Sequence, residues 1–259
     1  MAHILAVAGG KGGIGKTTTS INLGAALNYF GKDVTIVDAN LSTPNIGIHL
    51  GSPKVPIHLH HVVKGLNHIS EAVYLHKSGM KVIPASLSIE DFKDSAPEKL
   101  KDHIQNLKTD IALLDTAAGL GREALASINA ANKVLIVTNP ELPSLTDALK
   151  TIKLCHELNK NIIGVVLAKT NYKDENEIGV KAVEQFLGYP VISIIPEDKK
   201  IKESLRQREP VVYLFPKSEA AIAYKKLAAK LIGREYDEVV EEEVKEEKGF
   251  FSKLFSVFQ

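Results

Sequence analysis

Short apolar runs alternate with longer amphipathic segments along most of the chain. The runs have the length and composition of buried strands and occupy residues 3–8, 33–38, 81–83, 111–114, 134–137, 162–167 and 191–195. Apolar residues at helical spacing occupy residues 18–30, 97–107, 122–130, 145–158, 176–187 and 218–232. Strands that alternate with helices are joined by right-handed crossovers and lie in parallel. The pattern therefore predicts an α/β fold, with a mostly parallel sheet covered by helices on both faces.

Residues 41–79 interrupt this alternation, and prolines punctuate them. We expect a switch loop with short helices here. The segment also holds four histidines, with no acid or cysteine at convincing ligand spacing: His58, His60, His61 and His68. The sequence favours ordinary surface or core histidines over a metal site.

A glycine-rich stretch between the first predicted strand and the first predicted helix fits the phosphate-loop template of Gly, four residues and Gly-Lys-Ser/Thr. It reads Gly10-Lys11-Gly12-Gly13-Ile14-Gly15-Lys16-Thr17-Thr18. Its glycines let backbone N–H groups converge on phosphate oxygens, and the positive end of the following helix dipole faces the same charge. We expect Lys16 to bridge the β- and γ-phosphates and Thr17 to bind a magnesium ion. The second lysine, Lys11, is not required by this cradle.

Two carboxylates are predicted at the same edge of the sheet. Asp38 and Asp115 each end an apolar strand, and the carboxyl ends of parallel strands face the ligand in open α/β sheets. We expect Asp115 to be a second-shell acceptor for magnesium and Asp38 to lie near the ion and its waters. The small, glycine-bearing stretch 116–121 suits a loop that senses the γ-phosphate.

Composition narrows the function further. Lys plus Arg number 32 and Asp plus Glu 31, so no global charge excess favours nucleic acid. Cys155 is the single cysteine, which excludes a disulfide or a thiolate cluster within one chain. The chain begins directly with strand residues and holds no apolar run of spanning length, so we expect a cytoplasmic protein.

The C-terminal end changes character twice. Residues 1–234 hold the α/β pattern, 235–248 are an acidic linker, and 249–259 are a tail rich in phenylalanine. Four large apolar residues of the tail follow helical spacing, namely Phe251, Leu254, Phe255 and Phe258. Phe250 and Lys253 are the other candidate membrane residues. This amphipathic stripe favours binding to an anionic membrane surface. The alternative is a short helix that docks on its own domain.

The chain resembles the MinD/ParA group of deviant phosphate-loop ATPases of the SIMIBI type, most closely its MinD branch, over nearly its full length. The matching pieces are residues 11–18, 37–38, 114–119, 138–141 and 195–198 and the tail. The resemblance implies ATP and Mg²⁺ as cofactors, and a homodimer in which Lys11 reaches the phosphates of the partner. It also implies a protein partner or activator, and places adenine near Pro196, Asp198 and Asn171.

Two positions depart from the family pattern. Ala168 stands where an asparagine or threonine is frequent, and Asp38-Ala39-Asn40 replaces Asp-x-Asp. An amide cannot act as a base, but it can position the attacking water, so Asn40 predicts slow hydrolysis.

The sequence thus favours a MinD-like ATPase that cycles between soluble monomer and membrane-bound ATP dimer and positions a cell-division or other polar assembly. The alternatives are a ParA-like DNA- or cargo-segregating ATPase with a basic patch at 199–208, an iron–sulfur carrier and a non-hydrolysing nucleotide-gated scaffold.

Overall fold

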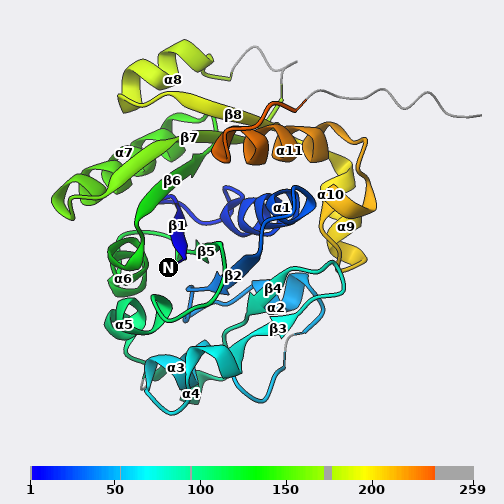
Figure 1. Ribbon diagram of the computed structural model, residues 1–259. Coiled ribbons are helices and arrows are strands. Elements are labelled where there is room, and N and C mark those ends of the chain that lie inside the picture. Colours follow the sequence, from blue (N-terminus) through cyan, green and yellow to red (C-terminus); the bar gives the residue numbers. More distant parts are fainter. Residues whose placement is uncertain (1, 53, 94, 172–176, 237–259) are drawn as a thin grey trace, which may run out of the picture.

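The computed structural model describes residues 2–52, 54–93, 95–171 and 177–236. Within these residues, one sheet has the strand order β3-β4-β2-β5-β1-β6-β7-β8 (Figure 1). The strands are β1 (His3–Ala8), β2 (Val34–Asp38), β3 (Tyr74–Leu75), β4 (Lys81–Ile83), β5 (Ile111–Asp115), β6 (Lys133–Thr138), β7 (Asn161–Thr170) and β8 (Val191–Pro196). Every neighbouring pair is parallel except β3 and β4. The predicted α/β fold is confirmed.

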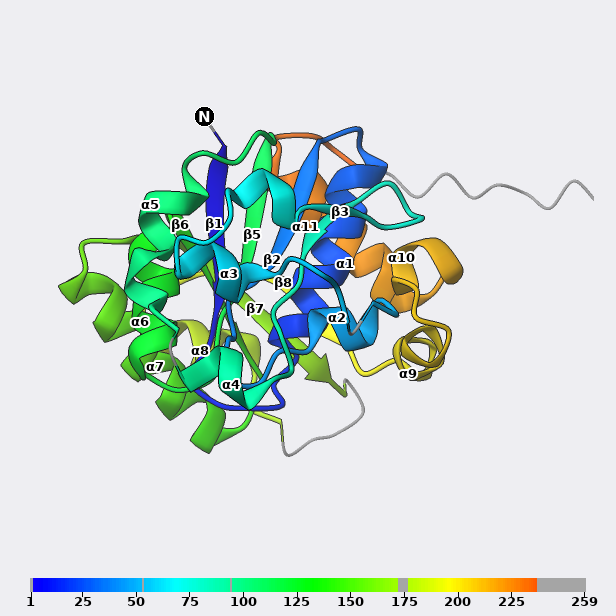
Figure 2. The ribbon, with the colours of Figure 1, turned by 90° about the horizontal axis from the view of Figure 1, so that it is seen from below.

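Helices cover both faces of the sheet. In Figure 2, α5, α6 and α7 lie on one side of the strands and α1 and α10 on the other. The helical segments are α1 (Lys16–Tyr29), α2 (Ile46–His49), α3 (Leu59–Val63), η1 (Ile69–Ala72), α4 (Ile89–Lys93), η2 (Pro97–Lys99), α5 (Leu100–Ile104), α6 (Arg122–Ala130), α7 (Leu142–Glu157), α8 (Val180–Leu187), α9 (Lys199–Arg206), α10 (Val211–Leu214) and α11 (Glu219–Leu231).

Each face of the sheet has its own apolar core, because the strands are buried on both sides and alternate residues point to opposite faces. Side chains of α3, α5, α6, α7 and α8 pack on one face, and Ile136 of β6 belongs to this cluster. Side chains of α1, α2, α10 and α11 pack on the other, and Leu135 of β6 belongs to that cluster. The single cysteine, Cys155, is buried in α7.

The predicted strands all exist, but several short elements were not expected. The segment 41–79 contains the short helices α2, α3 and η1 and also the strand β3, a two-residue antiparallel edge that is too short to leave a pattern. The single helix predicted over 97–107 is a 3₁₀ turn, η2, followed by α5. The elements α4 and α10 were missed because they are short, and α9 because Ile201 and Leu205 are its only large apolar residues.

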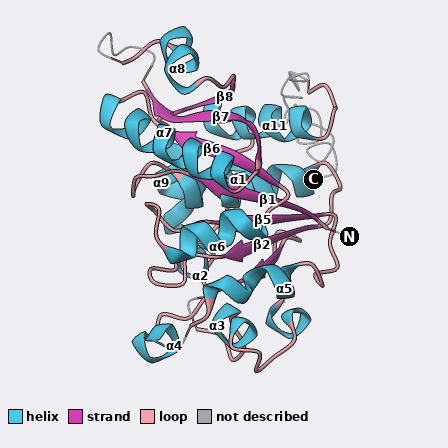
Figure 3. Ribbon diagram, turned by 90° about the vertical axis from the view of Figure 1, so that its left-hand side faces the viewer, coloured by secondary structure: helices cyan, strands magenta, loops and turns pink. Residues whose placement is uncertain are grey.

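The register of the central strands places the predicted site. β1 lies between β5 and β6, and β5 lies between β1 and β2 (Figure 3). Val7 and Asp38 both pair with Asp115, so the ends of β1, β2 and β5 come together where the glycine loop leaves β1. The sheet itself therefore brings residues that are distant in sequence to one place.

The predicted tail falls on residues that the structure does not describe. Residues 237–259 lie outside the described ranges, and with them most of the predicted linker and the candidate membrane residues. Among the described helices, none has both the length and the apolar character needed to cross a bilayer.

Candidate nucleotide-binding site

The glycine loop turns sharply between β1 and α1, and its backbone requires glycine at several points. Gly13 and Gly15 have φ angles of 79° and 102°, a region that side chains rarely adopt. At Gly10, an added Cβ would lie 2.5 Å from the carbonyl oxygen of Asp147. In the described part of the chain no side chain caps the start of α1, so the N–H groups of its first turn face the loop without a side-chain acceptor. This is the arrangement that binds an anion.

The lysine of this loop is buried where a phosphate would lie. Lys16 is only 7% exposed, and its Nζ donates to the backbone oxygen of Lys11 at 3.2 Å. Burial lowers the pKa of Lys16, and the nearby Asp115 carboxylate opposes this shift. A desolvated cation held against backbone carbonyls gains strongly from an incoming phosphate, because the Coulomb attraction is weakly screened there.

The carboxylate of Asp115 is held by two hydroxyl groups of α1. Thr17 Oγ1 donates to Asp115 Oδ2 at 2.6 Å, and Ser20 Oγ donates to Oδ1 at 3.0 Å. Burial raises the pKa of Asp115 to about 6, although both hydrogen bonds and Lys16 act in the opposite direction. Ser20 was not predicted as a site residue. Its position three residues after Thr17, on the same face of a helix, was the signal available in the sequence.

A second buried carboxylate lies beside the first. Asp38 Oδ2 accepts hydrogen bonds from the N–H groups of Asn45 and Ile46, both at 2.9 Å. Its other oxygen is buried with no hydrogen-bond partner among the described residues. Burial and then repulsion by Asp115 raise the pKa of Asp38 well above its usual value. Such a pair fits a hard divalent cation such as Mg²⁺, which prefers oxygen ligands and retains several of its waters.

Lys11 extends away from its own loop toward α7. Its Nζ lies 3.5 Å from Ser144 Oγ and 3.5 Å from Glu141 Oε2, and its side chain is 43% exposed. Glu141 belongs to the Asn139-Pro140-Glu141 motif. The structure thus gives the second lysine a surface position at the mouth of the site.

The amide of Asn40 is held within its own loop. Its Nδ2 donates to the backbone oxygen of Thr43 at 2.6 Å, and its Oδ1 accepts from Thr43 Oγ1 at 3.0 Å. Both ends of the side chain are therefore occupied. Positioning a water from Asn40 would require Thr43 to give up one of these bonds.

A small cavity of about 250 Å³ adjoins the glycine loop on the side of β7 and β8. Its lining includes Gly15, Ala168, Lys169 and the stretch Pro196–Asp198, near which the family resemblance predicts adenine. Asn171 is not part of that lining, and its N–H donates to Glu177 Oε1. Lys169, which was not predicted, has a φ of 57° and donates from Nζ to the Gly13 oxygen at 2.5 Å. Position 169 carries no motif that would have revealed this contact.

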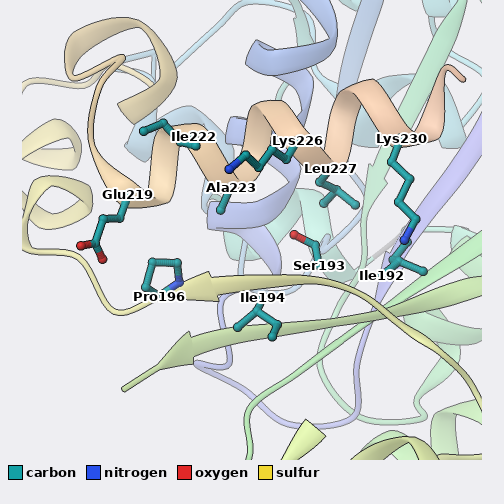
Figure 4. A pocket seen from close by; sticks show the side chains of 10 residues that line it. All are labelled: Ile192, Ser193, Ile194, Pro196, Glu219, Ile222, Ala223, Lys226, Leu227 and Lys230. Atoms are coloured by element: carbon teal, nitrogen blue, oxygen red, sulfur yellow. The ribbon is translucent and has the colours of Figure 1, made fainter. Parts of the chain in front are cut away.

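A larger hollow of about 600 Å³ lies between β8 and α11 (Figure 4). Side chains of both elements line it, with Ile194 from the strand and Leu227 from the helix, and Lys226 and Lys230 also contribute. None of the glycine-loop residues reaches it. It is therefore separate from the phosphate site.

The sheet order, the glycine loop and the paired carboxylates define a P-loop nucleotide-binding protein. Comparison with known proteins agrees: the ParA family, described as an NUBPL iron-transfer P-loop NTPase, matches residues 1–232. The chain belongs to the ParA/MinD family of P-loop NTPases. The glycine loop of this family fits the phosphates of a nucleotide, and the two carboxylates described above fit a Mg²⁺ ion bound with it.

Three relatives illustrate the similarity. An ATP-binding protein of Methanocaldococcus jannaschii is 38% identical over 256 residues, covering 98% of this chain and 96% of the relative. The cell division ATPase MinD of Pyrococcus furiosus has a TM-score of 0.86 at 33% identity, covering 90% of this chain and 99% of that one. The septum site-determining protein MinD of Pyrococcus horikoshii, complexed with Mg-ADP, has a TM-score of 0.85 at 32% identity, covering 89% and 96%.

We predict that the two buried carboxylates lower the stability of the folded protein when no ligand is bound. Because the folded-state pKa of Asp115 is about 6 against 3.8, ionisation opposes folding, and stability falls as pH rises through this interval. We expect Asp38→Asn to raise the melting temperature of the nucleotide-free protein at about pH 7, by roughly 2–4 °C per kcal/mol gained. The gain should fade toward about pH 4, where wild-type carboxylates are protonated. Calorimetry at both pH values measures this.

The matched control is Asp33→Asn, which removes an exposed carboxylate paired with Lys81. It should leave the pH dependence of melting nearly unchanged, since an exposed ion pair contributes little. A lower melting temperature for Asp38→Asn at neutral pH would show that the buried charge is already compensated within the chain.

Proposed function

We propose that this protein is a MinD-like ATPase that dimerises on binding ATP, associates with the cytoplasmic face of the membrane through its tail, and is released by slow hydrolysis. The observation that carries the proposal is the position of Lys11, a cation of the phosphate loop that its own loop does not use. The role that follows from the relatives named MinD is the placement of a cell-division or other polar assembly.

The contacts of Lys11 suit an exchange of partners. Its ammonium interacts with Glu141 and Ser144 at 3.5 Å, and both ion-pair side chains are about half exposed. Such surface pairs contribute about 0–1 kcal/mol. A charge-assisted contact to a phosphate is worth more, about 1.5–3 kcal/mol. Lys11 would therefore leave Glu141 for the γ-phosphate of a second subunit, and association would depend on the nucleotide bound.

The chemistry needs little beyond positioning and charge. Lys16 would neutralise the β- and γ-phosphates, and Lys11 from the second subunit would stabilise the charge that develops on transfer. Mg²⁺ would be held by Thr17, with Asp38 and Asp115 accepting hydrogen bonds from its waters. The remaining requirement is a group that orients water, and Asn40 meets it only by releasing Thr43. Slow turnover follows.

Avidity explains how the tail could respond to this cycle. Each large apolar side chain of residues 249–259 contributes roughly 1.5–3 kcal/mol when fully buried, while ordering each residue costs about 1–2 kcal/mol. One tail would therefore bind a membrane marginally. Two linked tails gain about 10²–10⁴ in affinity without any new contact.

Other functions have less support. The basic helix α9, where DNA contacts would be expected, is partly neutralised, because Lys200 pairs with Glu203 at 2.8 Å and Lys202 lies 3.8 Å from Glu197. Iron transfer or cluster carriage would need thiolates, and the single Cys155 is buried with its pKa raised by burial to about 11. A non-hydrolysing scaffold remains the alternative that Asn40 favours.

We expect Lys11→Ala to weaken ATP-dependent pairing while nucleotide still binds. Losing a charge-assisted bond at each of two sites should weaken dimerisation by about tenfold or more. Size-exclusion chromatography with Mg²⁺ and a nonhydrolysable ATP analogue, against ADP, measures the dimer. Glu141→Ala is the control, since it removes the resting partner of Lys11 and should preserve the dimer. Dimers of Lys11→Ala as stable as the wild type would refute the role in trans.

Asn40→Asp should increase the steady-state rate of phosphate release by about tenfold. This is less than the increase of about 10²–10⁴-fold that a fully positioned general base provides. The carboxylate would repel the Thr43 oxygen, now 2.6 Å from the Asn40 amide nitrogen, and would be free to turn toward the water. Thr43→Val, which removes the hydroxyl bound to Asn40 Oδ1, serves as the control for loosening of the loop alone. An unchanged rate for Asn40→Asp counts against any role for position 40.

Sedimentation with anionic lipid vesicles tests the membrane step. We expect the protein to pellet with Mg²⁺ and a nonhydrolysable ATP analogue and to stay in the supernatant with ADP. Phe255→Glu should abolish pelleting, because it places a charge on the apolar stripe. Ser256→Glu adds the same charge off the stripe and should retain most of it. Equal pelleting in both nucleotide states would contradict nucleotide control.

A further inference from the structure

Outside the nucleotide site, three side chains with metal-ligating atoms converge between α3 and α4. We propose that His58, His61 and Asp91 form a binding site for a transition-metal dication of the zinc class. The ligand atoms of the three residues all lie within 4.8 Å of one another. His58 directly precedes α3, His61 lies one turn further along it, and Asp91 comes from α4. The sequence shows no acid at convincing ligand spacing to these histidines within residues 41–79, and the fold brings in Asp91 from α4.

The two imidazoles have ring nitrogens that nothing in the described chain satisfies. The Nδ1 atoms of His58 and His61 are both buried without a hydrogen-bond partner among the described residues. Their rings stack with centroids 3.8 Å apart and an interplanar angle of 22°, so one ring has to turn for both to bind a single ion. Buried polar atoms are nearly always paired, so the unpaired Nδ1 of His61 indicates a missing ligand, while His58 faces Asp91 through Nε2.

The histidine between them shows the contrast. His60 uses both ring nitrogens within the protein: Nδ1 accepts from the Ser86 N–H at 3.1 Å, and Nε2 lies 3.2 Å from the Leu41 oxygen. This is a structural histidine with a fixed tautomer. In His58 and His61, by contrast, one ring nitrogen has no hydrogen-bond partner among the described residues, although His58 is only 6% exposed.

The charges near the cluster are compatible with a cation. Burial lowers the pKa of His58, and a hydrogen bond from Ser86 lowers that of Asp91, so both shifts favour the deprotonated forms that bind a metal. The competing cation is Lys64, whose Nζ lies 4.0 Å from Asp91 Oδ1. It approaches the oxygen that does not face His58, so Oδ2 stays available.

The ligand set and spacing select the metal class. Two imidazole nitrogens and one carboxylate oxygen suit Zn²⁺ and its neighbours, whereas Mg²⁺ prefers oxygen ligands only. His58 Nε2 and Asp91 Oδ2 are 3.3 Å apart, which is about the edge of a tetrahedron around Zn²⁺ with bonds of about 2.0–2.1 Å. Ser86 Oγ donates to the same Asp91 oxygen at 2.6 Å and orients it, as outer-shell groups of metal sites do. A water would complete four-coordination.

A metal here would fasten the segment that follows β2. It would join α3 to α4, and His60 in α3 already contacts the backbone of Leu41, next to Asn40. The hydrogen bond between His60 and Leu41 therefore connects the helix of the proposed metal site to the loop that borders the nucleotide. Its existence does not depend on the proposed ATPase cycle.

Calorimetric titration of the chelator-treated, nucleotide-free full chain with Zn²⁺ tests the proposal. We expect one equivalent of Zn²⁺ to bind and to raise the melting temperature. Co²⁺ should give the visible absorption of a four-coordinate complex. Mg²⁺ should neither bind at this site nor raise the melting temperature. Asp91→Asn and His61→Ala should each weaken Zn²⁺ binding by about tenfold or more, and Ser86→Ala, which removes only the orienting hydroxyl, by about 10-fold or more.

His3→Ala is the matched control, because His3 is an exposed histidine on β1 and should leave Zn²⁺ affinity unchanged. Retained binding of Mg-ADP shows that each variant is folded. The proposal is overturned if the wild type shows no Zn²⁺-dependent stabilisation, or if Asp91→Asn and His61→Ala bind Zn²⁺ as tightly as wild type.

Discussion

Two carboxylates buried side by side at the ends of β2 and β5 are the constraint on which the rest of the site depends. Asp38 and Asp115 occupy paired positions in the sheet, and burial raises the pKa of both. The chain offsets this cost only in part, with two hydroxyls of α1 on one carboxylate and two backbone N–H groups on the other. One oxygen of Asp38 has no hydrogen-bond partner among the described residues, so the compensation is incomplete. A divalent cation bound with a nucleotide would complete it.

This constraint links the elements around it. The segment after β2 wraps onto Asp38 through Asn45 and Ile46, and α1 is fixed to β5 through Thr17 and Ser20. A change in charge at the site, such as loss of a phosphate, therefore acts on both the glycine loop and the segment after β2. Lys11 is held at the surface by a half-exposed ion pair with Glu141, and in the proposed function it carries that change to a second subunit.

Much of this arrangement was predictable from sequence, because it depends on local patterns with strong physical causes. Apolar runs gave every long strand, and the glycine loop with its lysine gave the phosphate site. The partners were harder to predict. Thr43 on Asn40 and Lys169 on Gly13 are contacts of ordinary polar residues that have no sequence signature, whereas Ser20 on Asp115 was indicated only by its helical spacing from Thr17. The group of His58, His61 and Asp91 was missed for a different reason, since its acid is brought in by tertiary folding.

The most direct measurement is a crystal structure of the full chain with Mg²⁺ and a nonhydrolysable ATP analogue. We expect two subunits face to face, the metal on Thr17 with its waters bound to Asp38 and Asp115, and each Lys11 at the γ-phosphate of the opposite subunit. A single subunit in which Lys11 remains on Glu141 and the metal lies away from both carboxylates would contradict the proposed link between the buried charges and dimerisation.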